Sequence, residues 1–233
     1  HNEDEIARKD IRIGDIIKIE RAGDVIPHVI EVEKKKRTPG SKKFVFPLKC
    51  PSCGSETIKD YNKITKKFDA VRRCTNEGFE CERIAIEKIK HFISKEALNI
   101  DGLGKKVVEK FWELNLIKKP QDIFNLNYSK ILDMEGWGKL SVNNLISSIE
   151  KSKEVSLQRF IYSIGIRHIG IENAKLIGDN LKNISNFIEI IKQNNFDKFL
   201  NIDGIGETQV NSLKNFFSNR LNTNILIELN SIL

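Results

Sequence analysis

Four short segments of similar sequence recur along the chain, and they constrain its fold more than any other feature. We number them hairpins one to four: Ile100-Asp-Gly-Leu-Gly104, Met134-Glu-Gly-Trp-Gly138, Ile166-Arg-His-Ile-Gly170 and Ile202-Asp-Gly-Ile-Gly206. Three copies read apolar-x-Gly-apolar-Gly, and the third has His168 where the others have Gly102, Gly136 and Gly204. Consecutive copies lie 32 to 36 residues apart, which indicates one supersecondary unit used four times.

Helical periodicity surrounds each copy. Four residues after the last glycine of each hairpin the sequence has Val108, Val142, Ala174 and Val210, and seven residues after it Phe111, Leu145, Ile177 and Leu213. Spacings of four and seven mark one face of a helix. Short apolar-periodic runs precede the hairpins, at 94–99, 129–132, 157–163 and 196–200. The repeated unit is therefore predicted to be a helix, a tight turn and a second helix.

A glycine turn that opens a helix is suited to an anion. Glycine permits positive φ and lets another molecule approach the backbone. The first N–H groups of the helix lack an intrahelical acceptor, and the positive end of its dipole faces outward. Four such sites favour a polymer of phosphates, and main-chain contacts to phosphate carry no base preference. The candidate residues are Gly102, Gly104, Lys105, Lys106, Gly136, Gly138, Lys139, Arg167, His168, Gly170, Gly204 and Gly206.

Two other interpretations of the hairpins remain open. A period near 34 residues also fits a helical-repeat module that binds proteins, although such repeats do not need two glycines around one apolar residue. Plain helix C-capping accounts for one glycine in each turn but not for both. The lysines also fit a solvated helix face, His168 fits a role in stabilising its turn, and Trp137 fits core packing.

The composition favours a negatively charged binding partner and argues against a membrane protein. The 233 residues carry a formal charge of +7 and the pI is about 9.1, which favours binding to a polyanion. No apolar run approaches 18 residues, so we expect no membrane span. The sequence contains no phosphate-binding Walker loop, no nucleophile-base pair and no Lys-x-Asp-Gly. We therefore expect no catalytic residue in this chain.

The first part of the chain has the pattern of β-structure. Alternating apolar residues at 11–19 and 25–32 predict two antiparallel strands joined by a turn at Ala22-Gly23-Asp24. Two strands are marginal alone, so we expect the chain to open inside a β-domain whose earlier strands are missing. The charged stretch 33–43 contains Pro-Gly and is predicted to be an exposed loop.

The four cysteines of the chain predict one metal site. They are Cys50 and Cys53 in a Cys-Pro-x-Cys-Gly knuckle, followed by Cys74 and Cys81. Such a knuckle brings two thiolates to one ion, and four thiolates complete tetrahedral zinc with no open position for catalysis. Two disulfides are the alternative, but they require an oxidising compartment that no other feature supports. The six-residue spacing of the second pair is the less specific half of the pattern.

In this order the parts resemble the bacterial NAD-dependent DNA ligases, from the second half of their OB domain onward. The resemblance lies in the stretches His1-Asn2, Asp4-Glu5-Ile6, Arg12-Ile-Gly-Asp15, Arg21-Ala-Gly-Asp-Val-Ile-Pro27, Phe46-Pro47, Cys50-Pro-Ser-Cys-Gly54, Arg73-Cys-Thr75, His91-Phe92, Ile100-Asp-Gly-Leu-Gly104 and Gly165-Ile-Arg-His-Ile-Gly170. They run through nearly the whole chain, and His168 agrees with the third hairpin of that family.

The resemblance implies a multidomain α+β architecture. Residues 1–45 would form the C-terminal part of an OB-fold, 46–93 a four-cysteine zinc finger with its connection, and 94–233 a tandem helix-hairpin-helix domain. In that family the OB segment meets the minor groove near the nick, which carries over to Arg21, Val25 and Ile26. The hairpin glycines carry over as backbone contacts to phosphate.

The resemblance also implies an activity for the parent protein. That protein would be an NAD-dependent DNA ligase of replication and repair, a monomer in the bacterial cytoplasm near the nucleoid, acting on nicked double-stranded DNA. Its lysine nucleophile, NAD and magnesium would lie outside this chain, which would hold the structural zinc and be inactive alone. The alternative is a stand-alone, structure-specific DNA-binding module of a repair or recombination protein.

Overall fold

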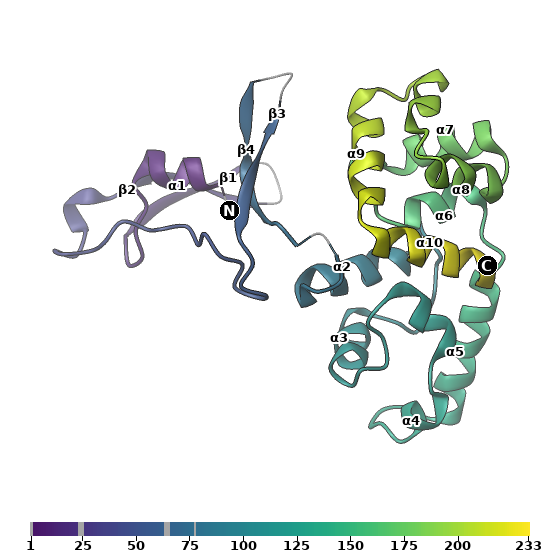
Figure 1. Ribbon diagram of the computed structural model, residues 1–233. Coiled ribbons are helices and arrows are strands. Elements are labelled where there is room, and N and C mark those ends of the chain that lie inside the picture. The colour runs from purple at the N-terminus through teal and green to yellow at the C-terminus, as the bar shows by residue number, and fades with distance from the viewer. Residues whose placement is uncertain (1, 23–25, 63–65, 77) are drawn as a thin grey trace. The chain divides into compact units, whose positions relative to one another are not determined.

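The computed structural model describes residues 2–22, 26–62, 66–76 and 78–233. The chain divides into two compact units, His1–Glu77 and Gly78–Leu233. The first unit contains a short helix and two β-ribbons, and the second is helical in all its described elements (Figure 1).

The first β-ribbon of the N-terminal unit is shorter than the sequence predicts. Strand β1 (Ile17–Ala22) pairs antiparallel with β2 (Ile26–Val32), and a bulge lies between Lys18 and Ile19. The strand expected from residue 11 begins only at Ile17. Residues 10–15 are instead held in a polar network that involves a distant arginine.

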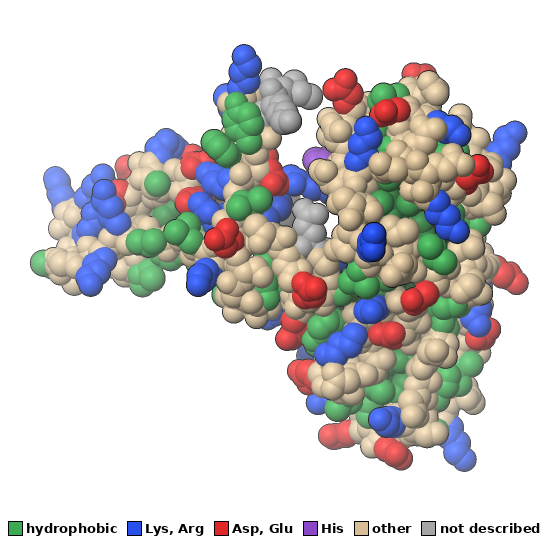
Figure 2. Space-filling model, viewed as in Figure 1, with side chains coloured by type: hydrophobic (Ala, Val, Ile, Leu, Met, Phe, Trp, Pro, Cys, Tyr) green, Lys and Arg blue, Asp and Glu red, His purple; other side chains and the backbone are tan. Residues whose placement is uncertain are grey.

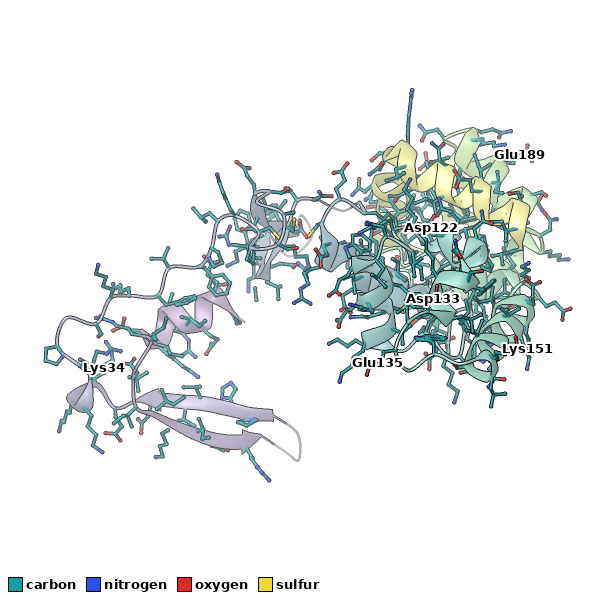
Figure 3. The ribbon with its side chains drawn as sticks, turned by 90° about the horizontal axis from the view of Figure 1, so that it is seen from below. Lys34, Asp122, Asp133, Glu135, Lys151 and Glu189 are labelled. Atoms are coloured by element: carbon teal, nitrogen blue, oxygen red, sulfur yellow. The ribbon has the colours of Figure 1, made fainter. Side chains whose placement is uncertain are left out.

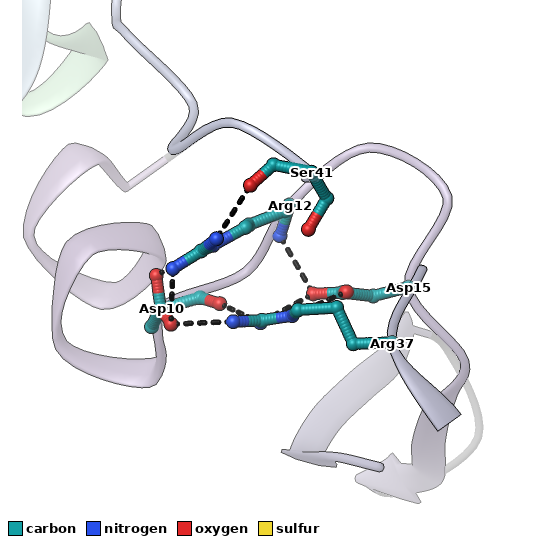
Figure 4. Close-up of polar contacts among 5 residues, drawn as sticks. All are labelled: Asp10, Arg12, Asp15, Arg37 and Ser41. Carbon is teal, nitrogen blue, oxygen red and sulfur yellow. Dashed lines mark hydrogen bonds and ion pairs between the residues drawn. The ribbon is translucent and has the colours of Figure 1, made fainter. Parts of the chain in front are cut away.

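Arg37 is the centre of that network (Figure 4). Its guanidinium contacts the Asp10 carboxylate at 2.6 Å and the Asp15 carboxylate at 2.8 Å, and the Asp15 side chain is only 2% exposed. Arg12 donates to both Asp10 and the carbonyl of Ser41. The charged stretch 33–43 is mostly exposed, as predicted, but Arg37 anchors it after a short 3-10 turn η1 (Lys34–Lys36).

The second β-ribbon packs against the first helix of the unit. Strands β3 (Thr57–Asn62) and β4 (Lys67–Cys74) pair antiparallel. Helix α1 (Glu3–Lys9) begins at Asn2, whose side chain accepts from two backbone N–H groups of its first turn. Lys59 on β3 contacts Asp4 at 2.7 Å, and Arg72 on β4 contacts Glu3 at 3.1 Å. These ion pairs join α1 to the ribbon.

The helical unit is built around one continuous hydrophobic core. All eight positions that the sequence places on the inner helix faces are at most 3% exposed. The described elements of this unit are α2 (Glu82–Phe92), α3 (Lys105–Glu113), η2 (Pro120–Asn125), α4 (Tyr128–Leu132), α5 (Lys139–Ser152), α6 (Leu157–Ser163), α7 (Ile171–Leu181), α8 (Ile184–Lys192), η3 (Phe196–Asn201), α9 (Glu207–Ser218) and α10 (Arg220–Ile232).

The predicted helix-turn-helix units are present with small changes. Helices α3, α5, α7 and α9 follow the four hairpins, and α4 and α6 precede hairpins two and three. The run before hairpin four is the 3-10 turn η3, and the run at 94–99 forms successive turns.

Candidate nucleic-acid interface and metal centre

The third residue of each hairpin has the same left-handed backbone conformation. Gly102, Gly136 and Gly204 have φ values of +91°, +83° and +86°, and His168 has +62°. Glycine adopts this left-handed region without the steric cost that a Cβ imposes. In hairpin three the carbonyl of His168 accepts a hydrogen bond of 2.8 Å from the Asn173 side chain, which helps to hold the turn.

The last glycine of each hairpin is the N-cap of the following helix. Gly104, Gly138, Gly170 and Gly206 precede α3, α5, α7 and α9 with extended backbone that any residue adopts. A Cβ at the first three of these positions would meet no atom within 4 Å. Neither backbone strain nor packing therefore requires glycine there. What glycine provides is an open approach to the first N–H groups of the helix.

The apolar residue between the two turn positions faces inward. Leu103, Ile169 and Ile205 are at most 6% exposed, and Trp137 is half-buried with its ring 5.6 Å from that of Phe111. The hairpins therefore present backbone, and not an apolar wedge, to their surroundings.

The four hairpins differ in the hydrogen bonds already made by their N–H groups. The N–H of Gly138 donates to Ser141 Oγ at 2.9 Å, and that of Gly206 donates to Gln209 Oε1 at 3.2 Å. These two partners were not predicted. A signal was available for hairpin four, since Gln three residues after an N-cap is the second residue of a capping box.

The hairpins also differ in charge. Lys105, Lys106 and Lys139 are exposed and make no ion pair among the described residues, and no acidic residue occupies the first turn of α3 or α5. Asp133 and Glu135 are exposed just before the tip of hairpin two (Figure 3).

Hairpin three has exposed Arg167 and His168 but also Glu172 in the first turn of α7. Hairpin four carries Asp203 and Glu207 and no basic residue. The sequence-predicted cations thus lie at hairpins one to three. On the face seen in Figure 2, basic and acidic side chains are interspersed over the helical unit.

The residues predicted to meet the minor groove lie at the first β-ribbon. Arg21 is an exposed residue of β1, paired across the ribbon with Pro27. Val25 lies outside the described residues, and Ile26 begins β2. The structure thus puts Arg21 and Ile26 near the same end of the ribbon.

The four cysteines come together as their spacing predicts. Their sulfur atoms all lie within 4.8 Å of one another, and Cys53 Sγ is 3.5 Å from Cys74 Sγ. The knuckle is closed by a 2.9 Å hydrogen bond from the Gly54 N–H to the Cys50 carbonyl. Cys74 ends β4, and Cys81 is the N-cap of α2. None of the four forms a disulfide, and a single cluster of four sulfur atoms favours a metal site over two disulfides.

The thiols of Cys53 and Cys74 have different environments. Hydrogen bonds from Ser55 lower the pKa of Cys53 to about 6, whereas burial raises the pKa of Cys74 to about 12. Four thiolates this close repel one another and are partly desolvated. A bound cation would remove both penalties, so this donor set fits a soft divalent metal.

Among the residues that the structure describes, no helix combines the length and the apolar composition needed to cross a bilayer.

Comparison with known proteins gives matches at both ends of the chain. Residues 1–41 match the family model of the NAD-dependent DNA ligase OB-fold domain, and residues 159–226 match that of the helix-hairpin-helix motif. These matches and the cysteine cluster confirm the expected fold class of a partial OB segment, a small four-cysteine module and a helix-hairpin-helix domain.

Curated relatives are similar over almost the whole chain. A DNA ligase of Pelagibacter ubique is 66% identical over 229 residues, which are 98% of this chain and 34% of that protein. DNA ligases of Parvibaculum lavamentivorans and Rickettsia bellii are 42% and 43% identical over 97% and 100% of the chain, or 33% and 34% of their own length. The chain thus spans about a third of the length of these relatives.

Proposed function

The chain belongs to the NAD-dependent DNA ligase family, and we propose that it is the part of such an enzyme that holds nicked duplex DNA. It spans about a third of its relatives and contains no Lys-x-Asp-Gly. The lysine nucleophile, the NAD and the magnesium of the ligation reaction would therefore lie outside this chain. As a piece of the parent enzyme it would act in replication and repair.

The observation that carries the proposal is the shared geometry of the four hairpins. In each hairpin the third residue is left-handed, and the final glycine opens a helix of at least nine residues. In this proposal the N–H groups at these turns donate to phosphate oxygens at Gly102, Gly104, Gly136, Gly138, Gly170, Gly204 and Gly206. The N–H groups of Gly138 and Gly206 would exchange their present side-chain acceptors, three residues further on, for the phosphate. Lys105, Lys106, Lys139, Arg167 and His168 would add charge beside them.

The arrangement suits a clamp that does not select a base sequence. Main-chain donors recognise phosphate oxygens whatever base is attached. Four hairpins along the chain can contact the sugar-phosphate backbones of both strands of a duplex. Arg21, Val25 and Ile26 would meet the minor groove near the nick. Holding the duplex in this way orients the two ends that the ligation step must join, which is a large part of its barrier.

The metal in this proposal is one structural zinc held by Cys50, Cys53, Cys74 and Cys81. Four thiolates leave no coordination position for a substrate, so the ion would stabilise the fold and take no part in the reaction. We assign residues 1–45 to the OB segment, 46–93 to the zinc finger with its connection, and 94–233 to the helix-hairpin-helix domain. The parent enzyme would act as a monomer in the bacterial cytoplasm, at the nucleoid.

Binding to nicked duplex is the direct test. Affinity of the purified chain for a fluorescent nicked duplex should fall steeply with salt, with a log-log slope of about 0.9 for each phosphate neutralised. Two nicked duplexes of unrelated sequence should bind equally well. Strong preference for one sequence, or binding that does not respond to salt, would contradict the proposal.

The absence of nucleotidyl transfer can be tested separately. Covalent attack on NAD needs an activated amine beside a bound nucleotide. The purified chain, incubated with radiolabelled NAD and magnesium, should therefore acquire no covalent label. A labelled band from pure chain would place the nucleophile among these residues and overturn this assignment.

A further inference from the structure

An open groove of about 560 Å³ lies beside hairpin three, between that hairpin and α2. Both walls belong to the helical unit and are fixed against each other. His91 Nε2 lies 2.7 Å from the carbonyl of Tyr162, and its ring packs on the Tyr162 ring. Gly165 has φ +71°, and a Cβ on it would lie 3.1 Å from His91 Cδ2. The groove is thus formed before any ligand binds.

The wall formed by α2 is cationic. Arg83 is exposed and makes no hydrogen bond or ion pair among the described residues. The one carboxylate that lines the groove, Glu87, is paired with Lys90 at 2.7 Å. Lys88 adds a second positive charge, placed over the rings of Phe79 and Phe216 at 5.1 and 5.6 Å. A ligand with negative charge along its length would complement this wall.

The floor of the groove is apolar and makes no array of polar groups that could read a base. It is formed by Ile84, Ile166 and Ile169, the last two being at most 4% exposed. Such a floor suits the carbon face of a sugar, while a guanidinium at the rim suits the planar, bidentate contact with a phosphate. The groove is too open to enclose a small molecule.

We propose that this groove binds the sugar-phosphate backbone of one DNA strand, and that Arg83 contacts a phosphate there. The inference rests on the proposed function, because it assigns a path to a strand that hairpin three would already hold. A strand whose phosphate meets the turn at Arg167 and His168 continues over Ile169 into the groove and reaches α2. The zinc finger would then be followed directly by a helix that contributes to DNA binding.

The substitution Arg83→Ala tests this contact. In the full 233-residue chain it should lower the log-log slope of DNA affinity against salt by about 0.9. The ratio of unsubstituted to variant affinity should then shrink about 3.5-fold between 50 and 200 mM salt, equally for two duplexes of different sequence. Arg83→Lys, which keeps the charge, should retain the slope.

Arg220→Ala is the matched control, because Arg220 is also exposed and unpaired among the described residues but lies at the start of α10, outside the groove. It should leave the slope unchanged, and both variants should keep the unfolding midpoint of the parent chain. An Arg83→Ala slope equal to that of the parent, or an Arg220→Ala loss of the same size, would overturn the inference while leaving the DNA clamp intact. A parent chain that binds no duplex at all would overturn both, so the two failures are distinguishable.

Discussion

Within one hairpin the two turn positions require glycine for different reasons. Gly102 has φ +91°, so a Cβ there is strained even though its nearest neighbour, Leu145 Cδ1, is 3.5 Å away. Gly104 has φ −63° and open space around it. The first glycine is therefore a requirement of the fold. The second is not, and the proposed approach of a phosphate to the turn would explain it.

A pair of alanine substitutions separates these roles. Gly102→Ala should lower the free energy of unfolding by about 1 kcal/mol, since it places a Cβ in the left-handed region. Gly104→Ala should leave stability unchanged or raise it by about 0.5 kcal/mol. It should nevertheless weaken DNA binding roughly tenfold, as expected for the loss of one hydrogen bond to a charged acceptor. Denaturant unfolding and anisotropy titrations measure the two effects, and equal losses of stability would refute the distinction.

The Arg37 network should make the stability of the N-terminal unit fall as the pH falls. Hydrogen bonds from Arg12 and Arg37 hold the pKa of Asp10 well below its usual range, and a hydrogen bond from Arg37 lowers the pKa of Asp15. A carboxyl with a lowered folded-state pKa stabilises the fold above its unfolded pKa of about 3.9, and this contribution is lost as pH falls through the folded value. The N-terminal unit should therefore lose stability below about pH 4.

Arg37→Gln should flatten that acid dependence, because both carboxyls then lose a cationic partner. Urea unfolding at several pH values, followed by a probe in the N-terminal unit, measures it. Arg21→Gln is a suitable control, since Arg21 is exposed on β1. If the free energy of unfolding of the variant falls at low pH as much as that of the parent chain, the network does not couple to folding.

The helices and hairpins are predictable because their signals are local. Spacings of four and seven place the buried faces of α3, α5, α7 and α9 correctly, and the glycines mark both the turns and the helix starts. The start of β1 is not predictable in this way. Residues 10–15 have strand-like alternation, but Arg37, 22 residues beyond Asp15, holds them in another conformation. A side-chain contact at that separation leaves no periodic trace in the sequence.

The hairpins are similar as backbones but unequal as electrostatic elements. Both hairpins carry an aspartate before the turn, but hairpin four has Glu207 and Thr208 where hairpin one has Lys105 and Lys106. Gln209 also accepts already from the Gly206 N–H. We therefore expect hairpin four to contribute least to phosphate binding. Hairpin four would then serve mainly to pack the helical unit. A Cβ on Gly204 would lie 2.8 Å from Leu176 Cδ1, so the turn fits closely against its neighbour.

Glu207→Gln tests whether acidic charge weakens phosphate binding at hairpin four. Removing the carboxylate should raise DNA affinity by about threefold. It should also lower stability by about 0.3 to 1 kcal/mol, because an acid at a helix N-terminus is favourable. Glu189→Gln on α8, outside every hairpin (Figure 3), makes the same charge change and should leave affinity almost unaltered. Equal gains from both variants would indicate a general charge effect and no special place for Glu207.

Across the whole molecule the two units differ in what can hold them together. The helical unit has a core that extends from Ala85 to Leu229. In the described part of residues 1–77 no apolar residue is buried, and apolar residues such as Ile13, Val45 and Phe68 are more than 60% exposed. Apolar content alone did not reveal this difference, because similar residues occur in both units. The N-terminal unit must depend on its ion pairs, its β-ribbons and the cysteine cluster.

Removal of the metal should therefore act mainly on the N-terminal unit, which supplies three of the four cysteines. We expect about one zinc in each purified chain, and its chelation should free the thiols of Cys50, Cys53, Cys74 and Cys81 for alkylation. Since a metal bound only by the folded state contributes its binding energy to folding, residues around β3 and β4 should become sensitive to proteases. The helical unit has its own core, so its helical circular dichroism and unfolding midpoint should persist. Substituting Cys50→Ser should reproduce the chelated state without a chelator. Loss of all helical signal on chelation would show that the helical unit cannot fold without the metal, and a metal-free chain with protected thiols would refute the site itself.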